Sequence, residues 1–183
     1  MLEQLASSLG FGNLGEPPQL TSYQRMQMVL DGQMPDRVPV CFWHHFRPEG
    51  SGRAMADATL RFFDQEFDLD IAKVMPDIPY PFPQRSVQQA NDWRLFEPID
   101  PGQSRFFRER AESVASIRDV LGMDTPVIMT VFSPLAEAMY AARDRELFLA
   151  HLEEHPALIH EVLTTIAMNL NNHIRDIIAA GAD

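Results

Sequence analysis

The chain has 183 residues, of which 45% are hydrophobic and 22% charged, a composition typical of a globular protein with a sizeable core. Its formal net charge of -11 argues against nucleic acid or an anionic membrane surface as a partner. No window approaches the roughly 20 apolar residues of a membrane span. The single cysteine, Cys41, excludes a disulfide within the chain and favours a reducing, cytoplasmic setting.

The N-terminal segment is predicted to be a flexible tail, residues 1–20, ahead of a folded domain at 21–183. It contains Glu3 but no Lys or Arg, and it lacks the charged start and apolar centre of a secretory signal. The domain then begins with a helix that Thr21 and Ser22 cap, whose apolar stripe includes Met26, and that ends at Gly32.

Residues 37–47 form the stretch around which the rest of the prediction is built. Pro39 precedes an apolar, β-branched and aromatic run, which is typical of a strand buried on both faces. The polar residues His44, His45 and Arg47 follow at its carboxyl end. Because parallel strands deliver reactive side chains from their carboxyl ends, we expect these three residues to bind substrate.

The remainder alternates strands and helices. It is predicted to contain strands at 70–75 and 126–132, a short strand at 93–96 within a proline-rich loop, and helices at 54–67, 104–121, 135–141, 144–154 and 156–180. Gly122 is expected to end the helix at 104–121, and Ser133 with Pro134 to begin the helix at 135–141. This order predicts a parallel α/β fold. A further strand would be expected after residue 183, so the sequence resembles the first part of a larger fold.

Two groups of polar residues are candidates for chemistry. Asp77 follows the strand at 70–75, and a carboxylate in that place could orient a cationic or N–H donating ligand. Ser133, Glu137 and Tyr140 share one face of a helix, where Tyr140 could donate a hydrogen bond to a charged intermediate.

Other motifs are weak or absent. The segment 151–155 matches the His-x-x-Glu-His pattern of some zinc peptidases, but Pro156 follows at once and disfavours a shared helical face for the two histidines. A solvated helix end is the favoured interpretation, and no metal site is predicted. Dinucleotide, P-loop and serine-hydrolase motifs do not occur.

Four stretches in this order resemble the uroporphyrinogen decarboxylase family, whose superfamily also contains corrinoid methyltransferases: Asp36–Val40, Val74–Ile78, Pro126–Tyr140 and Ala179–Asp183. The resemblance implies the N-terminal half of a (β/α)8 TIM barrel, truncated before the fourth strand and homodimeric when full length. It also implies a lyase of porphyrin biosynthesis that removes carboxylate groups from a tetrapyrrole without metal or organic cofactor.

The resemblance assigns roles to two residues. Asp77 matches the family's central aspartate, which holds the pyrrole N–H groups and stabilises the protonated ring, and Tyr140 matches an active-site tyrosine. The first loop departs from the family, because His44 and Pro48 stand where decarboxylases carry an Arg pair that clamps carboxylates. The predicted ligand is therefore a small anionic molecule, a tetrapyrrole or a related compound, bound with help from His44, His45, Arg47 and Ser133.

Two further functions stay open. One is corrinoid-dependent methyl transfer to a thiol, for which zinc would be held by a His-x-Cys and a distant Cys outside this sequence. The other is a barrel that binds a tetrapyrrole or another anion without turning it over.

Overall fold

The computed structural model describes residues 19–46, 51–75, 77–83 and 86–183. In this part of the chain, two short strands pair in parallel, β1 (Ala72–Val74) with β2 (Val127–Met129), with Ala72 opposite Val127. The predicted strands at 70–75 and 126–132 are thereby confirmed in place. Asp183 lies beside the other edge of β2, where its backbone N–H donates to the Val127 carbonyl at 2.9 Å.

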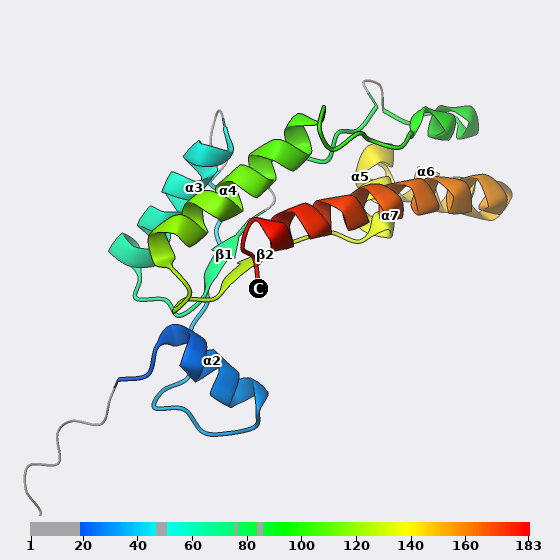
Figure 1. The fold of residues 1–183 in the computed structure, drawn as a ribbon. Coiled ribbons are helices and arrows are strands. Elements are labelled where there is room, and N and C mark those ends of the chain that lie inside the picture. Colours follow the sequence, from blue (N-terminus) through cyan, green and yellow to red (C-terminus); the bar gives the residue numbers. More distant parts are fainter. Residues whose placement is uncertain (1–18, 47–50, 76, 84–85) are drawn as a thin grey trace, which may run out of the picture.

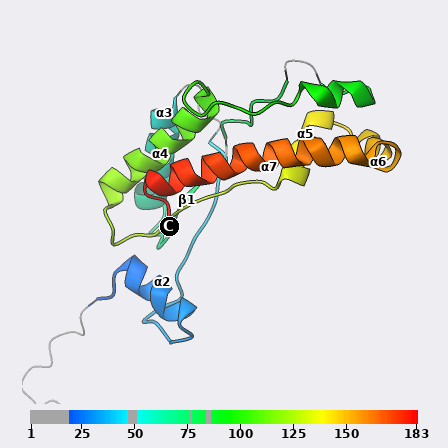
Figure 2. The same ribbon diagram turned by 45° about the vertical axis from the view of Figure 1, so that its right-hand side comes forward.

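In Figures 1 and 2 the first helix lies below this sheet and the other helices lie above or beside it. The helices are α2 (Ser22–Leu30), α3 (Gly52–Leu60) continued by the π-helix η1 (Arg61–Glu66), the 3₁₀-helix η2 (Ala90–Leu95), α4 (Arg105–Leu121), α5 (Pro134–Ala142), α6 (Arg145–Glu154) and α7 (Pro156–Ala179). The helix α4 runs beside α3 and α7, and α5 and α6 gather around the first half of α7. None of the helices in the described ranges is long and apolar enough to cross a membrane.

The helix ends follow the predicted signals. Thr21 and Gln24 form a capping box at α2, and Gly32 and Gly122 adopt positive φ where their helices stop. Ser133 caps α5 with Pro134 in its first turn, as the sequence predicts.

Two apolar clusters form the core. One packs β1 and β2 against α3, α4 and the end of α7, with Val74, Val114 and Val127 fully buried. The other joins α5, α6, α7 and η2 around Trp93 and Phe148. The two clusters meet at Val131, which follows β2 and packs against both.

The segment around residues 37–46 differs from its prediction. It has no strand, and two of its aromatic residues are exposed, Phe42 by 49% and Trp43 by 61%. One backbone hydrogen bond links it to the start of β1, from Asp70 N–H to the Val40 carbonyl at 2.9 Å. The prediction of a strand buried on both faces is therefore wrong within the described residues, because the segment lacks a ladder partner and a covering layer.

One other local prediction is wrong. Residues 93–96 lie at the end of the 3₁₀-helix η2 and not in a strand, since Asp92 accepts hydrogen bonds from the N–H groups of Gln88 and Gln89 and closes a turn there. The helix α2 forms as predicted, and its one buried residue is Arg25. The predicted tail at 1–20 lies almost wholly outside the described residues.

An ionic cluster fastens α2 to the amino end of β1. Asp70, which is fully buried, accepts hydrogen bonds at 2.5 Å from Arg25 and from Arg37 and at 2.8 Å from the Val40 N–H. Arg25 also pairs with Asp36 at 2.6 Å. Burial raises the pKa of Asp70, but the hydrogen bonds from Val40 and Arg25 and the two arginine charges outweigh it, and the pKa is lowered.

Candidate active site

Asp77 lies just beyond the carboxyl end of β1 and is held by the segment that precedes α3. Its Oδ1 is 2.5 Å from His45 Nδ1, and its Oδ2 accepts a hydrogen bond from the Phe46 N–H at 2.9 Å. The Asp77 side chain is 3% exposed, whereas that of His45 is 44% exposed. The structure thus brings together two of the residues that the sequence places in a site.

The other residues of the first loop lie differently. His44 is exposed and stacks on Phe62, with ring centroids 5.7 Å apart and an interplanar angle of 20°. Its ring also meets Phe46 edge-on at 5.1 Å. His44 therefore borders the Asp77 and His45 pair through an aromatic cluster. Arg47 lies outside the described residues.

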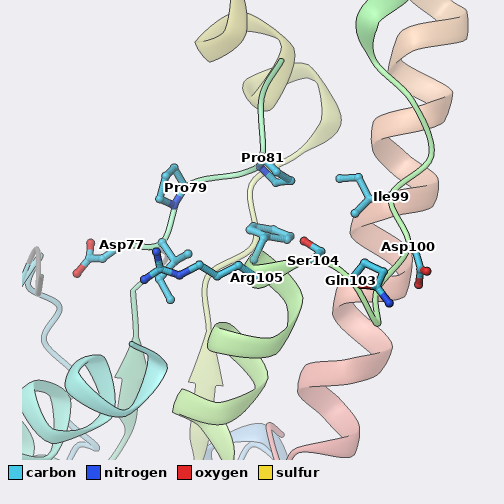
Figure 3. Close-up of a pocket in the computed structure, with 10 residues that line it drawn as sticks. Asp77, Pro79, Pro81, Ile99, Asp100, Gln103, Ser104 and Arg105 are labelled. Atoms are coloured by element: carbon cyan, nitrogen blue, oxygen red, sulfur yellow. The ribbon is translucent and has the colours of Figure 1, made fainter. Parts of the chain in front are cut away.

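A pocket of about 590 Å³ opens beside Asp77 (Figure 3). The Asp77 carboxylate points away from Ile99 and Ser104, and the side chain of Arg105 extends across the pocket from the first turn of α4. The pocket thus combines the Arg105 guanidinium with two aspartates and with apolar walls. Its lining consists of Asp77, Ile78, Pro79, Pro81, Ile99, Asp100, Gln103, Ser104, Arg105 and Phe106.

Ser133 and Tyr140 do not line this pocket. The Ser133 hydroxyl accepts the Ala136 N–H at 3.2 Å, so it acts as the cap of α5. Tyr140 is 54% exposed and packs edge-on against Phe132 at 5.5 Å. Ser133, Glu137 and Tyr140 therefore do not form one polar face, because Glu137 is buried whereas Tyr140 is exposed.

Arg110 is a site neighbour that the sequence prediction missed. It is 1% exposed, and its Nε and Nη2 donate to the carbonyl of Ile78, next to Asp77, at 2.9 and 2.5 Å. Its guanidinium also lies 4.3 Å above the Phe106 ring. Burial lowers the pKa of Arg110 to about 10, although the charges of Glu137 and Asp77 act in the opposite direction.

Two more buried polar groups lie around Arg110. His173 is fully buried with its Nε2 3.4 Å from Arg110 Nη1, and burial together with the arginine charge lowers its pKa to about 3. Burial raises the pKa of Glu137, and the positive charge of Arg110 partly offsets this shift. The signal in the sequence was a polar residue on an apolar stripe, since Arg110 follows Phe106 and precedes Val114 at helical spacing.

The His-x-x-Glu-His segment is not wholly the solvated helix end that the sequence favoured, because its first histidine is buried. His151 is buried and its Nδ1 accepts the hydrogen bond of Trp93 Nε1 at 3.0 Å, while His155 ends α6. Within the described residues, no group of three or more His, Cys, Asp or Glu side chains is arranged to hold a metal ion.

The fold and the site define an α/β protein whose polar residues gather beyond the carboxyl end of a parallel strand. Residues 71–183 match the model of the uroporphyrinogen decarboxylase (URO-D) family, and the chain belongs to that family. The family resemblance drawn from the sequence is thereby confirmed.

Among solved structures, the chain is similar to a methyltransferase from Methanosarcina mazei, with 17% sequence identity and a TM-score of 0.61. The match covers 90% of this chain and 57% of the methyltransferase, so the chain shares the fold of little more than half of that protein. No curated protein sequence matches significantly.

Proposed function

We propose that the chain is the N-terminal part of a (β/α)8 barrel decarboxylase that removes carboxylate groups from a tetrapyrrole or a related anionic substrate. The observation that carries the proposal is the position of Asp77, a nearly buried carboxylate held beside a pocket at the carboxyl end of β1 in a chain of the uroporphyrinogen decarboxylase family. Active sites of parallel barrels are built at this end of the strands.

The chemistry suits a fixed carboxylate. Loss of carbon dioxide from an acetate group on a pyrrole needs an electron sink, and a protonated ring beside Asp77 supplies one. The pair of hydrogen bonds from His45 and Phe46 holds the carboxylate in place, so its charge is oriented before substrate binds. Tyr140, with its ring half exposed, would act as a hydrogen-bond donor.

Substrate carboxylates would be bound by basic side chains around the site. His44 and His45 are exposed, and His45 contacts Asp77. Arg105, which pairs with Glu109 at 3.1 Å, extends across the pocket (Figure 3). Arg47 would add a third guanidinium or imidazolium group from the same loop as the histidines. Ser133 would contribute through the amino end of α5 that it caps.

The barrel is supported by the sheet and by the relative lengths. Both strands run in parallel, and Asp183 begins to pair with the free edge of β2, as the next strand of a barrel would. The methyltransferase that matches 90% of this chain is considerably longer.

The proposal is tested by anaerobic incubation of the protein with uroporphyrinogen, with released carbon dioxide and product carboxylates both measured. We expect turnover, and we expect Asp77→Asn to reduce it by at least about 100-fold. Asp68→Asn is the matched control because the Asp68 side chain is 99% exposed, and it should leave the rate unchanged. Binding of uroporphyrinogen without carbon dioxide release would favour the non-catalytic barrel and contradict the proposal.

Methyl transfer is the second candidate, and the structural similarity to a methyltransferase favours it. In this reaction a corrinoid would carry the methyl group and a zinc ion would activate the thiol acceptor. The sequence has one cysteine and no His-x-Cys, so the zinc ligands would come from outside it. Demethylation of a methylcorrinoid in the presence of a thiol, without carbon dioxide release from uroporphyrinogen, would decide for this candidate.

A further inference from the structure

The hydrogen bonds of Asp77 fix which nitrogen of His45 carries a proton. A carboxylate only accepts hydrogen bonds, so His45 Nδ1, 2.5 Å from Asp77 Oδ1, must be the protonated nitrogen. The second oxygen is held by the Phe46 N–H, so the carboxylate cannot rotate away from the ring without losing a backbone donor. The neutral imidazole therefore presents an unprotonated Nε2.

The surroundings of His45 leave that nitrogen available. The side chain is 44% exposed, although the carboxylate that orients it is 3% exposed. Trp43 packs edge-on against the imidazole, with centroids 5.7 Å apart and an interplanar angle of 82°, and limits rotation of the ring. The neighbouring His44 differs, because it stacks face to face on Phe62 and makes no described hydrogen bond to a carboxylate.

We propose that Nε2 of His45 is the atom that exchanges protons with the substrate and that Asp77 orients it. This inference rests on the proposed decarboxylase function and adds a catalytic residue to it. The substrate is then an acetate group on a ring, and its methylene carbon must receive one proton as carbon dioxide leaves. A buried carboxylate, an oriented imidazole and an open second nitrogen form a general acid–base arrangement.

The proton-transfer step balances without a further reactant. The carbon–carboxylate bond breaks, carbon dioxide leaves, and the electron pair of that bond moves into the protonated ring. The side-chain carbon then forms a new C–H bond with the proton from Nε2 of the imidazolium, and the ring returns its own proton to water. Neutral His45 then recovers a proton from water, to which its side chain is accessible. Throughout the cycle, Nδ1–H stays bonded to Asp77, whose negative charge stabilises the imidazolium.

The first test reads the tautomer directly and needs no activity. Long-range proton–nitrogen NMR spectra of the protein should show neutral His45 with its hydrogen on Nδ1. Asp77→Asn should shift the population toward the Nε2–H form, since an amide can donate to Nδ1, while the signals of His44 stay unchanged. Native His45 with its hydrogen on Nε2 would overturn the proposal.

The second test uses turnover of uroporphyrinogen. His45→Gln should lower carbon dioxide release on the order of 100-fold. His160→Gln, at an exposed position on α7, is the control and should retain the native rate. If His45→Gln keeps its activity while Asp77→Asn loses it, Asp77 acts on the substrate directly and the role of His45 is refuted, whereas the decarboxylase function survives. If the native protein releases no carbon dioxide, the proposed function fails, and the proton-exchange role of His45 fails with it.

Discussion

Substitution of Asp70 by Asn should destabilise the fold strongly, because it leaves two arginines without their shared carboxylate. Asp70 is 0% exposed and Arg25 3% exposed, and Asp70 also accepts hydrogen bonds from Arg37 and from the Val40 N–H. Removing one partner of a buried ion pair typically costs about 3–5 kcal/mol. We expect a loss of this size in the free energy of unfolding measured by urea denaturation with circular dichroism.

A control variant and a double substitution test this expectation further. Asp68→Asn removes a carboxylate that lies 4.0 Å from Arg37 and is 99% exposed, so it should change the free energy of unfolding by no more than about 0.5 kcal/mol. The double substitution Arg25→Met and Asp70→Leu replaces the pair by apolar groups and should recover most of the loss. A loss below about 1 kcal/mol for Asp70→Asn, the value of an exposed pair, would refute the assignment of Asp70 as the anchor of α2.

Three other substitutions test the packing around the site. Arg110→Met should lower the free energy of unfolding by about 3 kcal/mol, because the Ile78 carbonyl loses its charge-assisted donors. Arg110→Lys should restore less than half of this loss, as measured by urea denaturation. Gly52→Ala should cost at least about 2 kcal/mol in thermal unfolding, since a Cβ there would overlap the backbone carbonyl of Glu109 and push α3 away from α4. The pKa of His173 is lowered from 6.5 to about 3, so the folded state resists a proton that the unfolded chain accepts. The contribution of neutral His173 to the free energy of unfolding should therefore be fully present above pH 6.5 and fall by about 1.4 kcal/mol per pH unit below it. His173→Gln should flatten this slope in denaturation curves recorded across pH.

The local signals in the sequence predicted most helices correctly. The positions of α4 and α5 follow from caps and from apolar spacing, which depend on neighbouring residues only, as at Gly122 and Ser133. The parallel arrangement of the two strands followed from their alternation with helices. These features need no knowledge of distant contacts.

The features that failed depend on distant partners. An apolar run such as Phe42-Trp43 becomes a strand only beside a ladder partner, and in the described residues this segment meets β1 through a single backbone bond. Arg25 and Arg110 are buried because Asp70 and the Ile78 carbonyl lie opposite them. The spacing of Arg110 on the apolar stripe indicates that it faces the core, but it does not reveal the distant partner.

The candidate site was predictable in part for the same reason. The contact between His45 and Asp77 could be anticipated, since both follow segments expected to end at one edge of the sheet. The roles assigned to Tyr140 and Ser133 remain predictions. The buried charges beneath the site were not anticipated, because they belong to the interior of α4 and α7.

The edge-on contact between Trp43 and His45 makes Trp43 an intrinsic fluorescence probe of His45. The sequence has two tryptophans, and Trp93 is fully buried in the core, whereas Trp43 is largely exposed next to the imidazole. Because the indole lies against the imidazole, emission from Trp43 should respond to any rearrangement of the His45 ring. A Trp93→Phe background would isolate that signal, so that stopped-flow fluorescence could follow changes at His45.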